Sequence, residues 1–411
     1  MNQDPLRRGL TPAQAAAPQQ PAQPQAPAPA GTMPRLHVVG VFGGLFCGYL
    51  GLSSVIPVLP RYVRETFSGA DVAIGLAVTA TAFTALIMRP VAGNLADRYG
   101  HRMVMRLGAL IVAAGGLLYF LPLGLPALVG IRLLLGVGEA SLFTAGAVWV
   151  VTLAPHNRRG QLIGLYGISM WFGISGGTFA GAALLHFGYG AVWTFSAAAP
   201  VAAFLLISSV PALAPAGRAG GRGNLLPRPA IVPGTALGLA SAGYAAVAAF
   251  VVLHLQARGI QSGVYVLSAY SAVYAGTRLV IGRLPDQLGP RRVAFWSGIG
   301  EAAGLLIIAA APNLPIALLG TLVMGAGFSL LHPSLALMVM NRTDRSRQGA
   351  ALGAYTSFWD LGFAIWGPLL GGIATGFHYP AVFVFGAACA LAAVAISLTV
   401  PQPSAQPVAA G

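Results

Sequence analysis

Three acidic residues lie inside long apolar stretches of this sequence, where a carboxyl group is unusual enough to indicate acid–base chemistry. The chain has only nine acidic residues, and these three are Glu139, Glu301 and Asp360. A charged side chain at the centre of a bilayer costs roughly 2.5–3.5 kcal/mol on insertion scales, so each is a candidate functional group. We predict that Glu139 and Asp360 carry a proton. The alternatives are a buried structural partner for Glu139 and an interhelical hydrogen bond for Asp360, and a packing or pairing role is favoured for Glu301.

Three arginines, Arg89, Arg132 and Arg278, also fall within apolar stretches. Arg132 and Glu139 share one helix face, since seven residues make about two turns, but their separation along the axis is about 10 Å. They therefore cannot simply neutralise each other along the helix. Arg89 and Arg278 lie near helix ends, where a long side chain can reach the lipid headgroups. We expect both to extend toward the headgroups, with a gating contact as the alternative.

The composition indicates a membrane protein. Hydrophobic residues make up 56% of the chain and charged residues 8%, whereas a soluble protein has about 25% charged residues. The 23 basic residues, all arginine, outnumber the 9 acidic ones, but they recur in short bursts between apolar runs, which argues against nucleic-acid binding. Cys47 and Cys389 are the only cysteines and lie in apolar stretches, so we expect no disulfide, no metal site and no cofactor.

Twelve apolar runs are long enough to span a bilayer as helices. They lie near 37–59, 73–95, 104–122, 126–152, 161–185, 190–211, 231–255, 263–283, 293–311, 315–340, 351–375 and 379–400. With both termini in the cytoplasm, 17 of the 23 arginines fall on the cytoplasmic side, as the positive-inside rule requires. No small-residue cleavage site follows the first run, which predicts an uncleaved helix. We expect a multi-pass protein of a bacterial inner membrane.

A copy of the first half recurs in the second half at one constant shift along the chain, the shift that carries Arg89 to Arg278. The run Arg89-x-x-x-Gly93-x-Leu95-x-Asp97-x-x-Gly100-x-Arg102 matches Arg278-x-x-x-Gly282-x-Leu284-x-Asp286-x-x-Gly289-x-Arg291. Two such bundles in one orientation enclose a cavity near the bilayer midplane. The predicted all-α organisation is a disordered cytoplasmic tail (1–35), a six-helix bundle (36–211), a cytoplasmic linker (212–230), a second six-helix bundle (231–400) and a C-terminal tail (401–411).

Residues 36–400 resemble the major facilitator superfamily. The most specific match is Gly93-Asn94-Leu95-Ala96-Asp97-Arg98-Tyr99-Gly100-His101-Arg102, which is similar to that family's signature loop between helices 2 and 3. The resemblance implies twelve transmembrane helices in two six-helix repeats, and a latch in which Asp97 closes the cytoplasmic side against helix 11. The expected gating residues are Gly93, Asp97, Arg98, Gly100, Arg102, Asp286 and Arg291.

Other segments are similar to further patterns of the family. Arg132 on helix 4 occupies a motif whose arginine is associated with proton coupling, so it becomes a third proton-coupling candidate. The glycines of helix 5 are similar to an antiporter motif, with departures at Thr178 and Ala182, where Pro and Gly are usual. The expected helix-packing glycines are Gly173, Gly177, Gly181, Gly367 and Gly371. Gly282-Arg283-Leu284-Pro285-Asp286, with the glutamate of helix 4, is similar to a little-characterised bacterial permease branch near the drug and arabinose exporters.

The cavity candidates follow from the position of each run in the chain. The resemblance implies that the first, fourth, seventh and tenth helices, here 37–59, 126–152, 231–255 and 315–340, line the cavity. The candidates are Tyr49, Ser53, Tyr244 and His332, with ordinary packing as the alternative for Tyr244 and His332.

The function expected from these features is proton-coupled efflux of a small organic compound by alternating access, with proton-linked uptake as the alternative. The sequence shows no cluster of acids, no His or Cys metal set and no nucleophile with its base, so an enzyme is not expected. A sensor is expected to carry an appended soluble domain, which argues against this alternative. The expected partners are the substrate, protons and membrane lipid, with no nucleic acid, and we expect a monomer.

Overall fold

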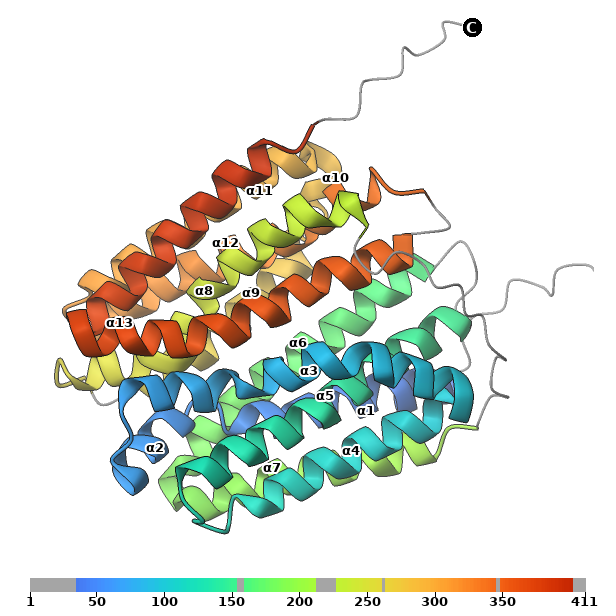
Figure 1. The fold of residues 1–411 in the computed structure, drawn as a ribbon, viewed down its shortest axis with the longest axis horizontal. Helices are drawn as coiled ribbons and strands as arrows, with labels where there is room; N and C mark the ends of the chain where they lie inside the picture. The colour runs from blue at the N-terminus through green and yellow to red at the C-terminus, as the bar shows by residue number, and fades with distance from the viewer. Residues whose placement is uncertain (1–34, 154–158, 212–226, 261–262, 345–347, 402–411) are drawn as a thin grey trace, which may run out of the picture. The chain divides into compact units, whose positions relative to one another are not determined.

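The structure of the protein is a computed structural model that describes residues 35–153, 159–211, 227–260, 263–344 and 348–401. Every regular element in these ranges is a helix (Figure 1). The predicted tails lie almost entirely outside the described residues, as does 212–226 of the predicted linker. The next helix begins at Arg228, within the range predicted as linker.

The helices divide between two sequence halves. The first half contains α1 (Arg35–Ser54), α2 (Leu59–Phe67), α3 (Asp71–Tyr99), α4 (His101–Leu118), α5 (Leu125–Leu153), α6 (Arg159–Leu184), the short 3₁₀ helix η2 (Leu185–Phe187) and α7 (Tyr189–Ser208). The second contains α8 (Arg228–Gln256), α9 (Val264–Ile281), α10 (Leu284–Leu288), α11 (Pro290–Ala310), α12 (Leu314–Met340) and α13 (Gln348–Leu398).

Eleven helical segments among the described residues are long and apolar enough to cross a membrane. One of them, Leu36–Phe67, joins α1 and α2. The last, α13, has 51 residues and a non-helical break at His378, whose φ is 65°. This break divides α13 into two spans, which brings the number to the predicted twelve.

The predicted loop 93–102 is largely helical. α3 continues to Tyr99 and α4 begins at His101, so only Gly100 separates them. Gly100 has a φ of +92°, a value that residues with a Cβ rarely adopt. Because glycine has no Cβ, the chain can turn there within one residue. Gly289 repeats this turn between α10 and α11 with a φ of +87°. The signature segment therefore forms a tight corner between two helices.

Equivalent contacts repeat in the two halves at the shift that carries Arg89 to Arg278, called the repeat offset below. The Tyr166 hydroxyl donates a hydrogen bond to the carbonyl oxygen of Phe143 at 3.1 Å. The Tyr355 hydroxyl donates to the carbonyl oxygen of His332 at 2.8 Å. Both members of the second pair follow their counterparts in the first by the repeat offset, so the sequence repeat is also a structural repeat.

Glycines bring α6 directly against the backbone of α1. A Cβ on Gly173 would lie 2.6 Å from the carbonyl oxygen of Phe46. A Cβ on Gly177 or Gly181 would likewise collide with backbone atoms of α1. Small residues at these positions permit an approach that larger side chains would block.

Glycines also allow close backbone packing between the two halves, where α13 contacts α3. A Cβ on Gly367 would collide with the backbone of Gly75, and one on Gly371 would meet the backbone of Asp71. The predicted packing glycines of α6 and α13 therefore lie at two different contacts, one within the first half and one between the halves.

Gly181→Ala is expected to destabilise the protein, because the new methyl group would enter the backbone of α1. Overpacking of this kind costs about 1–3 kcal/mol. Gly164→Ala on the same helix is the matched control, since a Cβ there meets nothing within 4 Å. It should leave thermal stability in detergent unchanged or slightly higher, as Ala favours helix. Equal melting temperatures for the two variants would contradict the close packing of α1 and α6.

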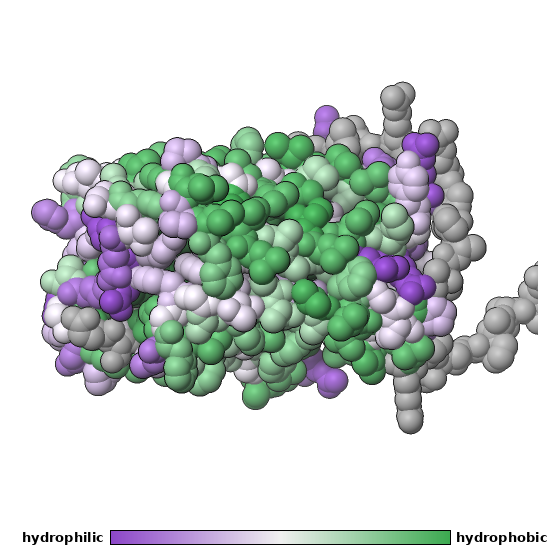
Figure 2. All heavy atoms as spheres, turned by 90° about the horizontal axis from the view of Figure 1, so that it is seen from below, coloured by the Kyte–Doolittle hydropathy of each residue, from purple (hydrophilic) through white to green (hydrophobic). Residues whose placement is uncertain are grey.

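Apolar side chains are exposed along the helices. Figure 2 shows hydrophobic residues across the middle of the face in view and hydrophilic residues gathered toward its two ends. Phe83, Phe179 and Leu205 lie within helices and are 56%, 61% and 62% exposed. Exposed apolar surface of this extent is suited to contact with lipid chains.

Candidate functional site

An ion pair between Arg89 and Asp360 joins the two halves. Arg89, on α3, donates from both Nε and Nη2 to the carboxylate of Asp360 on α13, with the Nη2–Oδ1 distance at 3.0 Å. The two side chains are 16% and 3% exposed, so water screens the pair poorly. The expectation that Arg89 reaches toward the headgroups is therefore wrong. The side chains of a helix lean toward its N-terminus, which for α3 directs Arg89 back into the bundle.

Glu139 accepts a hydrogen bond from a residue of α1. The Tyr49 hydroxyl donates to its Oε1 at 3.2 Å, so the structure brings together two residues predicted for different roles. Glu139 also lies close enough to Arg89 and Asp360 for their charges to act on it. An acidic residue of α5 is thus electrostatically linked to the ion pair between the halves.

Arg132 is engaged by backbone. Its Nε donates to the carbonyl oxygen of Ala77 at 2.8 Å and its Nη2 to that of Val78 at 2.7 Å, while Nη1 reaches the Tyr119 hydroxyl at 3.5 Å. The side chain is 2% exposed. Arg132 therefore ties α5 to α3, and its strong hydrogen bonds are made to carbonyl groups.

Aromatic rings surround Tyr244 on α8. Its ring centroid lies 5.4 Å from that of Tyr270, 5.6 Å from Trp359 and 5.4 Å from Phe363. Trp171 of α6 also lies 6.3 Å from Tyr244, across the boundary between the halves. Of these residues the sequence analysis named only Tyr244. The sequence pattern could not show that these rings are neighbours, because they come from four different helices.

A polar cluster joins the halves at the end of α3 that begins with Asp71. The Tyr379 hydroxyl of α13 donates to Asp71 Oδ1 at 3.1 Å and accepts from Arg64 Nη2 at 2.8 Å. Arg64 and Asp71 also form an ion pair. The sequence analysis did not single out Asp71 or Tyr379, although Asp71 is one of only nine acidic residues.

The two signature segments are residues 93–102 and their counterparts 282–291. Among the described residues, the side-chain hydrogen bonds of these segments stay within their own halves. Arg102 donates to the carbonyl oxygen of Ser208, and Arg291 to that of Leu398 at 2.7 Å. Arg98 lies over the ring of Tyr99 at 5.1 Å. The remaining predicted gating residues are placed as follows: Asp97 and Gly93 are half-buried, Asp286 is exposed, and Gly100 forms the corner described above.

Of three further residues from the sequence analysis, Ser53 and Glu301 are buried and His332 is half-buried. Ser53 is 1% exposed and lies against Gly177, at the contact of α1 with α6. Glu301 is fully buried, and neither carboxyl oxygen has a hydrogen-bond partner among the described residues. His332 Nδ1 is likewise buried without a partner in that part of the chain. Within the same residues, no three His, Cys, Asp or Glu side chains gather as a metal site would need.

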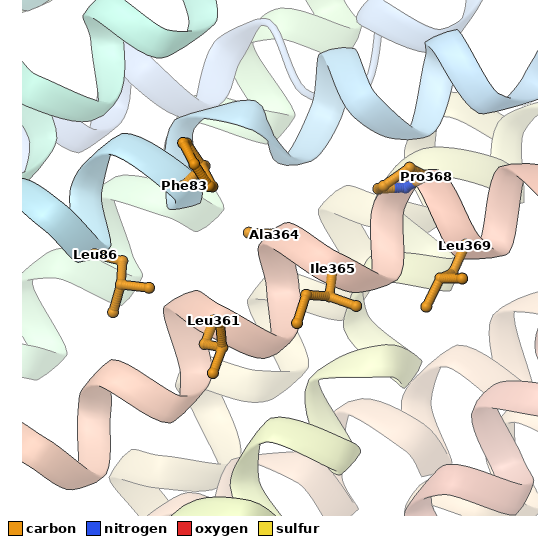
Figure 3. Close-up of a pocket in the computed structure, with 7 residues that line it drawn as sticks. All are labelled: Phe83, Leu86, Leu361, Ala364, Ile365, Pro368 and Leu369. Atoms are coloured by element: carbon orange, nitrogen blue, oxygen red, sulfur yellow. The ribbon is translucent and has the colours of Figure 1, made fainter. Parts of the chain in front are cut away.

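An apolar groove of 540 Å³ lies between α3 and α13. Figure 3 shows Phe83 and Leu86 on α3 facing a row of residues on α13. That row is Leu361, Ala364, Ile365, Pro368 and Leu369. Leu361 and Leu369 are 44% and 50% exposed, so the groove lies on the outer apolar surface, whereas the preceding Asp360 is buried.

The structure thus has two related halves with repeated contacts, a buried ion pair between them and exposed apolar surfaces. The family comparison identifies this fold. The model of the Major Facilitator Superfamily matches residues 41–237 and again 233–411. The chain belongs to the Major Facilitator Superfamily. The double match confirms the predicted two-repeat fold and the predicted resemblance.

Relatives from the Major Facilitator Superfamily extend along most of the chain. A protein of Burkholderia mallei, named as an uncharacterised MFS-type transporter, is 32% identical over 384 residues, 90% of this chain and 93% of the relative. One of Salmonella typhimurium with the same description is 31% identical over 368 residues, 87% and 94% of the two chains. The xylose transporter XylE from E. coli, in an inward-open conformation, shares the fold with a TM-score of 0.72 at 17% identity, over 91% of this chain and 98% of that one.

Membership of this superfamily establishes the general activity. The chain is a multi-pass membrane protein that performs secondary transport by alternating access, and it is not an enzyme.

Proposed function

We propose that the protein exports a small organic compound in exchange for protons, and that Asp360 and Glu139 bind the proton. The observation that carries this proposal is the Arg89–Asp360 ion pair, because it is buried and joins the two halves that must move apart. A proton on Asp360 removes the negative charge that holds Arg89. Proton binding would then weaken one contact between the halves and favour the state in which they separate.

Glu139 extends this proton site. Its charge acts on Arg89 and Asp360, and the Tyr49 hydroxyl can hydrogen-bond to the carboxyl in either protonation state. A carboxyl buried beside a hydroxyl and an ion pair can exchange a proton without losing all its polar contacts. Arg132 serves this site as a positioning residue, since it holds α5 against α3.

The gating proposal assigns the two ends of the bundle to two alternating contacts. Contacts between the halves are made at the Asp71 end by Tyr379, and at the same end His186 and Tyr265 lie with ring centroids 6.3 Å apart. Hydrogen bonds of the signature segments do not cross between the halves within the described residues. These contacts support a conformation that is open toward the signature segments. In the proposed cycle the Asp97 latch forms when the bundle opens at the Asp71 end.

Proton-linked uptake is the second candidate, and Thr178 favours it. This residue is fully buried on α6, where its hydroxyl donates to the carbonyl oxygen of Ser175 at 3.0 Å. Proline is usual here in the antiporter motif. The backbone of α6 therefore keeps a donor that proline would lack.

The direction of transport can be tested with everted inner-membrane vesicles, and activity in them also tests the proposed inner-membrane location. We expect acidification of the vesicle interior to drive accumulation of a labelled compound from a panel of drugs, sugars and organic acids and bases. Substrate addition should also release protons from the interior, measured with a pH-sensitive dye. Vesicles containing Asp360→Asn provide the background. Accumulation that needs acid outside right-side-out vesicles would establish uptake instead, and accumulation insensitive to a protonophore would exclude proton coupling.

A further inference from the structure

The two copies of the repeated arginine are not equally neutralised. Arg89 forms an ion pair with Asp360 and its guanidinium lies 5.1 Å from the ring centroid of Phe143. Its counterpart in the second half is Arg278, on α9. Arg278 reaches only the Tyr274 hydroxyl and a carbonyl oxygen of α12, both at the long distance of 3.4 Å. No ion pair among the described residues includes Arg278.

The repeat shows where the missing acid would stand. Asp360 lies on α13, and the repeat offset relates it to Trp171 on α6. Trp171 occupies the corresponding boundary between the halves, where its ring stacks on Tyr274 with centroids 3.7 Å apart. At the boundary of α3 with α13, Arg89 faces the carboxylate of Asp360. At the boundary of α9 with α6, Arg278 has the indole of Trp171 in the equivalent position. The protein supplies no counter-ion at the second boundary within the described residues.

A histidine adds a second polar group at the same place. The carbonyl oxygen that Arg278 contacts belongs to Ser329, and His332 follows three residues later on the same side of α12. His332 is the counterpart of Phe143, which lies beside Arg89. Its Nδ1 is buried and has no hydrogen-bond partner among the described residues, and the Arg278 charge acts on its ring.

An arginine in this position needs an anion. A cation in a transmembrane segment is costly unless it is paired, and two long hydrogen bonds to neutral groups do not provide that pairing. A guanidinium matches the planar oxygen pair of a carboxylate or the oxygens of a phosphonate through parallel N–H donors. Of the other charged groups inside the helices, Arg89 and Asp360 neutralise each other, and Arg132 is bound to carbonyl groups. Glu139 accepts from Tyr49 within the first half, and its charge repels an anion, so Arg278 is the cation left for one.

We propose that Arg278, Tyr274 and His332 bind the oxyanion of the transported compound, which is therefore a small organic acid. The Arg278 guanidinium and the Tyr274 hydroxyl donate to the carboxylate or phosphonate oxygens, His332 supplies a further hydrogen bond, and Trp171 offers an aromatic face to the carbon skeleton. This inference rests on the proposed transport function and names its substrate class. It also agrees with export, since a membrane potential negative inside favours outward movement of an anion by about 2.3 kcal/mol per charge per 100 mV.

Equilibrium binding to the purified full-length protein in detergent tests the substrate class without requiring transport. Benzoate and phenylphosphonate are the anionic probes, and benzylamine and benzyl alcohol carry the same ring with a positive or no charge. Calorimetry should show binding of at least one anion and at least about tenfold weaker binding of the amine and the alcohol. A charge-assisted hydrogen bond of about 1.5–3 kcal/mol corresponds to a factor of about ten or more.

Arg278→Gln should weaken anion binding by about tenfold or more, and Arg278→Lys by less, because it keeps the charge but loses the paired donors. Arg342→Gln is the matched control, since Arg342 is exposed just after α12 and its replacement removes the same charge. Both glutamine variants should elute as folded protein, and Arg342→Gln should keep the melting temperature and the anion affinity of the unaltered chain. Undiminished anion binding by a folded Arg278→Gln protein overturns the proposal, as does preferential binding of benzylamine or failure of both anions to bind at millimolar concentration.

An anionic lipid headgroup offers the same chemistry as a substrate oxyanion, so the titration is repeated in phosphatidylcholine and phosphatidylglycerol nanodiscs. Benzoate binding that depends on Arg278 in phosphatidylcholine supports a substrate site. Arg278-dependent binding of phosphatidylglycerol without any binding of the soluble anions assigns the site to lipid and overturns the substrate class. None of these outcomes depends on protons, so proton-driven exchange in vesicles remains a separate test of the proposed function.

Discussion

Asp360→Asn is expected to lower the free energy of unfolding by about 3–5 kcal/mol and to stop proton-driven transport. The substitution removes the carboxylate charge while Arg89 stays 16% exposed at the boundary between the halves. Breaking a buried ion pair by removing one partner leaves an uncompensated charge, which is the costly case. Thermal and denaturant unfolding in a fixed detergent would measure the first effect, and vesicle transport the second.

The double variant Arg89→Gln/Asp360→Asn distinguishes the cost of an uncompensated charge from the loss of the proton-binding carboxyl group. It removes both charges, so most of the lost stability should return, because a neutral pair carries no uncompensated charge. Proton-driven transport should remain absent, since Asp360, one of the two proposed proton acceptors, is still missing. Recovery of full transport in the double variant would show that Asp360 serves only to neutralise Arg89.

Arg61→Gln/Glu65→Gln is the control for ion pairing as such. These two residues form an ion pair within α2, with side chains 42% and 46% exposed. Exposed pairs contribute about 0–1 kcal/mol, so this control should change stability little. A loss as large as that of Asp360→Asn would mean that the position of the Arg89–Asp360 pair has no special importance.

The sequence predicted the helices, their repeat and the types of residue that matter. Hydrophobic runs specify spans because a bilayer admits little else, and the repeated motif at 89–102 and 278–291 specifies two related bundles. Even there a boundary differed, since α3 continues through Asp97 to Tyr99 until a glycine turns the chain. Pro90 and Gly93 lie inside α3 without ending it, and Leu95 and Ala96 favour the helix up to that glycine.

The partners of the charged residues could not be predicted in the same way. Arg89 and Asp360 are 271 residues apart, and their contact depends on which face of α13 meets α3. That face is set by Gly367 and Gly371, whose missing side chains let the two helices touch. Tyr379 reaches Asp71 just after the break at His378, a turn that the apolar pattern does not reveal.

Comparing the two halves recovers part of this information. The repeat offset identifies which residues should make equivalent contacts, so a missing partner becomes visible once one of the two contacts is known. Arg278 was predicted to extend toward the headgroups. Its hydrogen bonds instead run to Tyr274 and α12, which shows that the repeated arginine turns into the bundle in both halves.

Glu139→Gln is expected to abolish accumulation driven by a pH gradient while leaving the fold intact. A glutamine oxygen can still accept the hydrogen bond that the Tyr49 hydroxyl donates at 3.2 Å, so the packing of α5 against α1 should persist. A glutamine cannot bind and release the transported proton. For exchange of one proton per substrate molecule at zero membrane potential, one unit of pH gradient supports about a tenfold substrate gradient, since about 1.36 kcal/mol corresponds to a factor of ten. The variant should reduce that ratio to about one.

Proteoliposomes with the membrane potential clamped would measure the ratio, and counterflow between equal pH values would measure substrate movement without net proton transfer. We expect Glu139→Gln to retain counterflow, because exchange of substrate for substrate needs the cavity but no proton cycle. Asp344→Asn is the control, as it removes an exposed acid just after α12 and should keep the full gradient response. If Glu139→Gln still accumulates substrate tenfold, Glu139 is a buried hydrogen-bond partner of Tyr49, and proton binding must rest on Asp360 alone.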